Sequence, residues 1–185
     1  MSPHAGIVLA LMVLLVAAGV GKVFRPVPTA GALRLAGLPG SINLVRMLGV
    51  FEIAVGVGGI ASGGAIAAVT AAILYASFGG FVIYALRRRL PISSCGCLGA
   101  TDTPPSITHV VVNLFAMLAL TAGAIFPIGP WGGAGSEPDL AVPLVVLTAV
   151  TVYLLYGLIA VLPLVGRRPV PTMLELSPTR SSVNW

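Results

Sequence analysis

The chain has 185 residues, of which 57% are hydrophobic and only 8% are charged. A soluble domain carries about a quarter charged residues, so this chain lacks the polar surface that a water-soluble globule needs. Its net charge of +5 comes from short basic clusters at the ends of apolar runs, and no basic face or motif indicates binding to nucleic acid. The composition predicts a single all-α domain embedded in a lipid bilayer.

The first apolar run covers residues 5–20, contains no formal charge, and is followed by Lys22 and Arg25. A cleaved signal peptide is the alternative interpretation, but no basic segment precedes the run, which favours a retained transmembrane helix. We interpret Lys22 as an interfacial anchor of this helix. Residues 26–41, rich in proline and glycine, predict a short interfacial segment rather than a span.

The stretch 53–86 has no charged residue and is too long for one crossing, which takes about 20 residues. Its glycine-rich part, 58–64, predicts a hairpin between two spans. The sequence therefore predicts a polytopic transmembrane bundle over residues 1–166 and a polar, loosely ordered tail at 167–185. The predicted spans lie at about 5–20, 42–60, 65–86, 107–126 and 140–165.

Basic residues gather in alternate connections between the predicted spans. They lie between the first and second spans, at Arg87–Arg89 after the third, and at 167–168 after the fifth. The other side holds the uncharged hairpin and an acidic loop at 137–139. The positive-inside rule then predicts a bacterial inner (plasma) membrane protein with its N-terminus outside and its C-terminus inside.

The two cysteines of the chain form the motif Cys95-Gly96-Cys97, in the loop after the third span. Gly96 permits the turn that a disulfide between them requires, and the strain of so small a ring favours exchange. The preceding arginines would favour the thiolate form. The motif therefore predicts a redox-active pair, with inert loop residues as the alternative. Together with His109 the pair offers only three ligands, so we expect no metal site.

Glu52 lies within the second predicted span, where an ionisable residue is a functional-site hypothesis by default. At about 100° per residue, Gly49, Gly56 and Gly59 share its face, so Glu52 should point into the bundle along a glycine-lined packing surface. Arg46 lies on another face. Asn113, in the fourth span, is a candidate hydrogen-bond partner for Glu52 or Arg46. Glu52 then serves either as a polar clasp that fixes helix packing or as a proton donor or acceptor near the dithiol.

These features form a recognisable pattern, which runs as follows: Gly21-Lys22 at the end of the first span, Arg46-x-x-Gly49-x-x-Glu52 in the second, a third span with a basic end, Cys95-Gly96-Cys97-Leu98-Gly99, and Asn113 in the fourth span. Over about residues 5–127 the chain resembles the methylamine utilisation MauE family of DoxX-like membrane proteins. The resemblance implies a four-helix core, to which the fifth C-terminal span is added. Val112 stands where the family often has arginine, which removes one intramembrane partner for Glu52.

The resemblance also implies a function, the maturation of exported proteins, as in disulfide formation in the methylamine dehydrogenase light chain. Cys95 and Cys97 would be the redox pair of a membrane thiol–disulfide oxidoreductase, supported by Gly96, Gly99, Arg46, Glu52 and Asn113. The sequence indicates no bound cofactor, and a thioredoxin-like protein or a quinone is the candidate electron partner. The alternatives are a non-catalytic membrane assembly subunit and a small transporter that uses Glu52.

Overall fold

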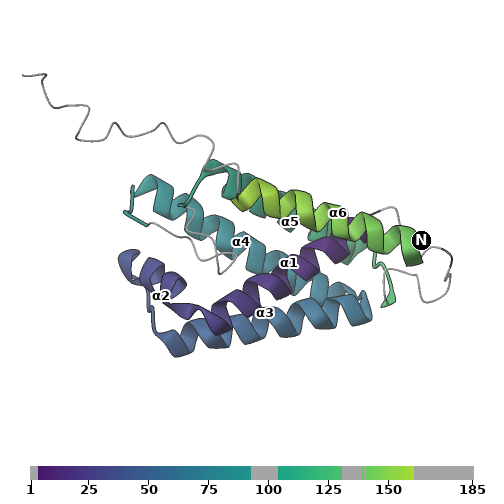
Figure 1. Cartoon of the computed structure of the whole chain (residues 1–185), viewed down its shortest axis with the longest axis horizontal. Helices are drawn as coiled ribbons and strands as arrows, with labels where there is room; N and C mark the ends of the chain where they lie inside the picture. Colours follow the sequence, from purple (N-terminus) through teal and green to yellow (C-terminus); the bar gives the residue numbers. More distant parts are fainter. Residues whose placement is uncertain (1–3, 93–103, 131–138, 140, 161–185) are drawn as a thin grey trace, which may run out of the picture.

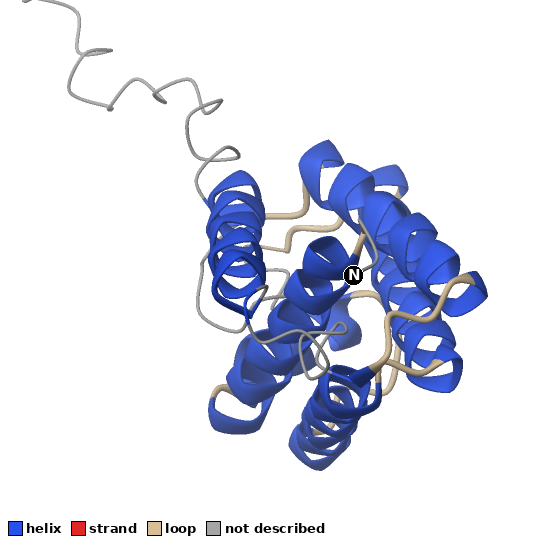
Figure 2. Ribbon diagram, turned by 90° about the vertical axis from the view of Figure 1, so that its right-hand side faces the viewer, coloured by secondary structure: helices blue, strands red, loops and turns tan. Residues whose placement is uncertain are grey.

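The computed structural model describes residues 4–92, 104–130, 139 and 141–160. These residues form helices and connecting loops, with no strand among them (Figure 2). Five of the helices are long and apolar enough to cross a membrane, which confirms the predicted polytopic helical bundle. They are α1 (Ala5–Phe24), α3 (Ile42–Ser62), α4 (Ala65–Arg87), α5 (Ile107–Ile125) and α6 (Ala141–Ala160).

The helix boundaries differ from the predicted ones at two places. α1 continues to Phe24, about one turn beyond residue 20, so that Lys22 lies inside the helix. α3 continues through Ser62, and the break before α4 is only Gly63-Gly64. Gly63 has a φ of 59° and its N–H donates to the carbonyl of Gly59 at 2.8 Å, a left-handed helix end that favours glycine. The hairpin is therefore confirmed, but it is tighter than predicted.

α2 (Pro26–Leu35) has 10 residues, whereas a membrane crossing takes about 20. Pro26 opens the helix, where its fixed φ is favourable and its missing N–H costs nothing. The helix lies at the end of the bundle opposite the N-terminus (Figure 1). The prediction that this segment is not a span is correct.

α1 is the central helix of the bundle, since it packs against α2, α3, α5 and α6. In Figure 1 it lies between α3 and α6. In the most apolar 18-residue stretch of α1, 56% of the residues are buried, compared with 11% in that of α6. α1 therefore supplies the core, and α6 is peripheral. The fully buried side chains of α1 include Leu11, Met12 and Leu15.

α1 and α3 approach so closely that their backbones touch. A Cβ added to Gly19 would lie 2.5 Å from the carbonyl oxygen of Gly49, and one added to Gly49 would lie 2.6 Å from that of Gly19. Further along, Gly56 and Gly59 face Met12. Small residues permit this approach in membrane helices. The predicted glycine-lined packing face of α3 is therefore confirmed.

Candidate functional site

A buried ion pair joins α1 and α3. Lys22 Nζ donates a hydrogen bond to Glu52 Oε2 at 2.9 Å, and the two side chains are 3% and 0% exposed. The ammonium also lies 4.9 Å from the centre of the Phe78 ring on α4, in cation–π geometry. A lone charge at this depth would be costly, whereas a paired and hydrogen-bonded charge is tolerated.

Matched spacings on the two helices create this pair. Gly19 and Lys22 are three residues apart on α1, as Gly49 and Glu52 are on α3. The helices run antiparallel, so each glycine faces the charged residue of the other helix. A Cβ on Gly19 would lie 3.0 Å from that of Glu52, and a Cβ on Gly49 would lie 3.0 Å from that of Lys22. The two glycines thus provide the space in which the charged side chains meet.

Two predictions about this region are wrong. Lys22 is not an interfacial anchor, because it is buried and its ammonium donates to Glu52. Asn113 does not reach Glu52 or Arg46. Its Nδ2 donates to the carbonyl of His109 at 2.7 Å, and Arg46 is exposed on the outer face of α3. The cation that pairs with Glu52 comes from α1 and not from α5. The carboxylate of Glu52 is therefore paired although residue 112 is a valine and not an arginine.

Lys22 was therefore missed as a site residue, although the sequence contained a signal for it. The two helices carry the same Gly-x-x-charge spacing with opposite charges, and such a repeat predicts complementary packing of an antiparallel helix pair. Phe78, which faces the ammonium, has no comparable signal, because its contact depends on how α4 is rotated against α1.

The second carboxylate oxygen of Glu52 is in a different situation. Oε1 is buried and has no hydrogen-bond partner among the described residues. Leaving a buried acceptor unsatisfied costs about 1–3 kcal/mol. This oxygen is therefore a position where a proton or a polar hydrogen-bond donor would be stabilised.

A cavity of about 320 Å³ borders Lys22 where α1, α2, α3 and α4 meet. Lys22, Thr29 and Ser77 are its polar lining residues, and the others are leucines, an alanine and the two aromatic residues Phe78 and Phe81. An apolar cavity of this size with a few polar groups is typical of a small-molecule site.

Cys95, Gly96, Cys97 and Gly99 lie outside the described residues, but both flanks of their segment are described. On one side, Ile92 is buried in a small cluster with Ala32 of α2 and Ala85 of α4, against which Phe81 packs. Ala32 and Phe81 also line the 320 Å³ cavity. The last described residue before Cys95 therefore packs against residues that line this cavity.

On the other side of the segment, His109 holds the start of α5. It is 1% exposed, and its Nδ1 lies 2.7 Å from Ser106 Oγ, within hydrogen-bond distance. Its carbonyl accepts from Asn113, and the Cβ of Asn113 lies where Gly79 of α4 leaves room. The hydrogen bonds of His109 and Asn113 are thus local to the start of α5, Asn113 packs against α4 at Gly79, and the described contacts of both residues do not include the ion pair.

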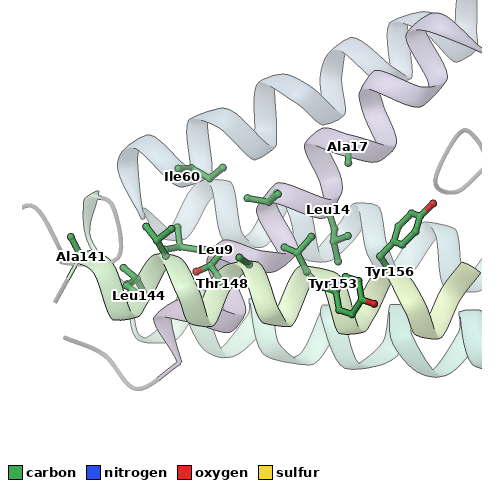
Figure 3. Close-up of a pocket in the computed structure, with 13 residues that line it drawn as sticks. Leu9, Leu14, Ala17, Ile60, Ala141, Leu144, Thr148, Tyr153 and Tyr156 are labelled. Carbon is green, nitrogen blue, oxygen red and sulfur yellow. The ribbon is translucent and has the colours of Figure 1, made fainter.

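A larger groove of about 710 Å³ runs between α1 and α6. In Figure 3, Ala141 and Leu144 lie toward one end of it and Tyr153 and Tyr156 toward the other. Apart from Thr148 and the two tyrosines, the lining side chains are aliphatic. This lining suits acyl chains and offers little that could act on a polar reactant.

Comparison with known proteins places most of this architecture in one family. No curated protein and no solved structure matches the chain. The model of the family described as "Methylamine utilisation protein MauE" matches residues 3–127, which include α1 to α5 and the Cys95-Gly96-Cys97 motif and leave α6 outside. The chain therefore belongs to the MauE family, as a membrane protein with several apolar helices.

Proposed function

We propose that the protein is a membrane thiol–disulfide exchange protein that uses Cys95 and Cys97 in the maturation of exported proteins. These are the only two cysteines of the chain, and they lie within the part that matches the MauE family. The observation that carries the proposal is the setting of Ile92. Ile92 packs with Ala32 and Phe81, two residues that line the cavity beside Lys22, and Cys95 follows three residues later, a reach of at most about 11 Å.

The chemistry begins with the pair in its disulfide form. A thiolate of the exported protein attacks one sulfur, which gives a mixed disulfide and releases the other cysteine as a thiolate. A second thiolate of the exported protein then attacks the mixed disulfide, which forms the product disulfide and leaves Cys95 and Cys97 reduced. Two electrons and two protons pass to the pair. A thioredoxin-like disulfide or a quinone would take them up again.

The substrate that the family resemblance implies is the light chain of methylamine dehydrogenase. The proposal needs only a protein with a pair of thiols, because the exchange acts on sulfur and not on methylamine.

Trapping of the mixed disulfide tests the proposal. Cys95→Ser and Cys97→Ser leave one thiol each, and an oxidised thioredoxin-like protein, whose disulfide this thiol can attack, is added to the reduced variant in nanodiscs. We expect one of the two variants to accumulate a mixed disulfide on a non-reducing gel, because the resolving thiol is absent. The double variant is the matched control and should form no adduct. If neither single variant is trapped and both mature the substrate in cells, the proposal fails.

A non-catalytic assembly subunit is the second candidate, and α6 is the observation that favours it. This helix lies outside the family match and exposes apolar side chains such as Val142, Val145 and Leu154. An apolar helix face within a bilayer can pack against a partner helix. Co-purification of a stable membrane partner with the Cys95→Ser/Cys97→Ser variant, without any loss of maturation, would favour this role over thiol exchange.

A further inference from the structure

The 320 Å³ cavity has a lining that selects a flat, largely apolar ligand. Phe78 and Phe81 present aromatic surface, and Leu33, Leu48 and Leu74 supply aliphatic surface. Rings stack favourably against aromatic side chains of this kind. The lining therefore favours a ring with an apolar tail over a sugar, nucleotide or peptide.

The charges beside the cavity restrict the ligand further. An ammonium group carries three N–H donors, and the described contacts of Lys22 use one of them for Glu52. Glu52 already balances the charge of Lys22. An anionic ligand would therefore add an uncompensated charge to an apolar site, and a cationic ligand would be repelled by the ammonium. A neutral ligand with a carbonyl acceptor fits both restrictions.

The cavity also reaches the outer surface of the bundle. Ser77 on α4 and Leu38 after α2 both line it, and both residues are exposed. An apolar tail attached to a ring in the cavity can therefore leave between these elements into the lipid.

We propose that this cavity binds the ring of a lipid-soluble quinone, with Lys22 donating a hydrogen bond to a ring carbonyl. Its role as electron acceptor rests on the proposed function: oxidation of a dithiol to a disulfide releases two electrons and two protons, and reduction of a quinone to its quinol takes up both. The binding of the ring itself does not depend on the cysteines.

Quinone binding is therefore measured on the Cys95→Ser/Cys97→Ser variant in nanodiscs, by equilibrium dialysis with a decyl-substituted benzoquinone. We expect saturable binding. Ser77→Phe fills the cavity from an exposed position and should weaken binding by about tenfold or more. Ala76→Phe is the matched control, because Ala76 is exposed on the same helix and does not line the cavity. It should bind the quinone as tightly as the parent variant.

Three results would overturn the proposal. Binding that does not saturate shows partition into lipid only, and unchanged affinity in Ser77→Phe places the quinone elsewhere. Equal competition by decylbenzene, which has the ring and the tail but no carbonyl, shows an apolar lipid cavity without a donor contact from Lys22. Mixed-disulfide trapping needs no quinone, so its result separates a failure of this site from a failure of the proposed thiol exchange.

Discussion

Lys22 and Glu52 carry opposite charges inside an apolar bundle, and each makes the burial of the other tolerable. The pair is held at 2.9 Å, and neither side chain reaches the surface. Removing one partner of a buried pair typically costs about 3–5 kcal/mol, because an uncompensated charge remains. Replacing both by apolar residues of similar volume is often neutral or stabilising.

We therefore expect Lys22→Met and Glu52→Leu to be severely destabilising as single changes, by about 3 kcal/mol or more each. The double variant Lys22→Met/Glu52→Leu should recover most of this loss. The measurement is the free energy of unfolding in detergent micelles, followed by circular dichroism and analysed as a double-mutant cycle.

Arg46→Met is the control for this cycle. Arg46 lies on the same helix as Glu52 but is exposed and has no ion pair among the described residues, so its replacement should change the free energy of unfolding by no more than about 0.5 kcal/mol. If the double variant is as unstable as the two single losses added together, the residues act independently and the pair does not stabilise the fold.

For single residues, the sequence predicts that Glu52 points into the bundle but not which side chain it contacts there. Its inward direction follows from the glycines on its own face of the helix, which is local information. Its partner depends on the register of α1 against α3, which is not local. Lys22 is also only two residues before the last residue of its helix, where a lysine usually extends to the membrane surface. Here the glycine opposite it lets the side chain turn inward instead.

The contact between α1 and α3 depends on glycine at particular positions of each helix. A Cβ added to Gly49 would lie closer to the backbone of α1 than van der Waals contact allows. Backbone atoms cannot move aside unless the two helices separate. Gly58 lies on the same helix with open space around its Cα, since nothing lies within 4 Å of an added Cβ. The two positions form a natural comparison.

We expect Gly49→Ala to lower the free energy of unfolding by about 1–3 kcal/mol, as overpacking does elsewhere. Gly58→Ala should be neutral or stabilising by up to about 1 kcal/mol, because alanine is the better helix former. Both are measured by denaturant titration in the same micelles. If Gly58→Ala lowers the free energy of unfolding as much as Gly49→Ala does, then helix geometry, and not contact with α1, accounts for the effect.

The elements themselves were predictable from hydropathy and length, because a crossing needs a nearly fixed number of apolar residues. The helix ends were less predictable. The sequence places the end of α1 before Lys22, since a charge usually marks the membrane boundary, whereas the buried pair lets the helix continue to Phe24. The hairpin could be located only within a glycine-rich stretch. Its exact position depends on Gly63, which alone among those glycines has a positive φ.

The two ends of the whole molecule differ in charge. Arginines gather at the end that holds α2, and all of those described there are exposed: Arg25, Arg34, Arg46, Arg87, Arg88 and Arg89. The opposite end holds His4, which lies within hydrogen-bond distance of the Phe126 carbonyl, and the exposed Asp139. This asymmetry favours an orientation with the α2 end in the cytoplasm.

Labelling of introduced cysteines tests this orientation. Arg88→Cys and Asp139→Cys are made separately in the Cys95→Ser/Cys97→Ser background, so that each protein has one thiol at an exposed position. We expect a membrane-impermeant maleimide to label Asp139→Cys in intact cells and Arg88→Cys only after permeabilisation. The two proteins are each other's control for expression and reactivity, and the reverse pattern would show that the molecule is inverted.

The orientation also decides which oxidant thiol exchange would require. Ile92 and Ser106, which flank the cysteine segment, lie at the arginine-rich end of the bundle. If Arg88→Cys is labelled only from inside, this end faces a compartment in which soluble carriers keep thiols reduced. An oxidant dissolved in the membrane is then the consistent electron acceptor for Cys95 and Cys97. If Arg88→Cys is labelled from outside, exported proteins can reach the pair directly, and a soluble thioredoxin-like protein suffices.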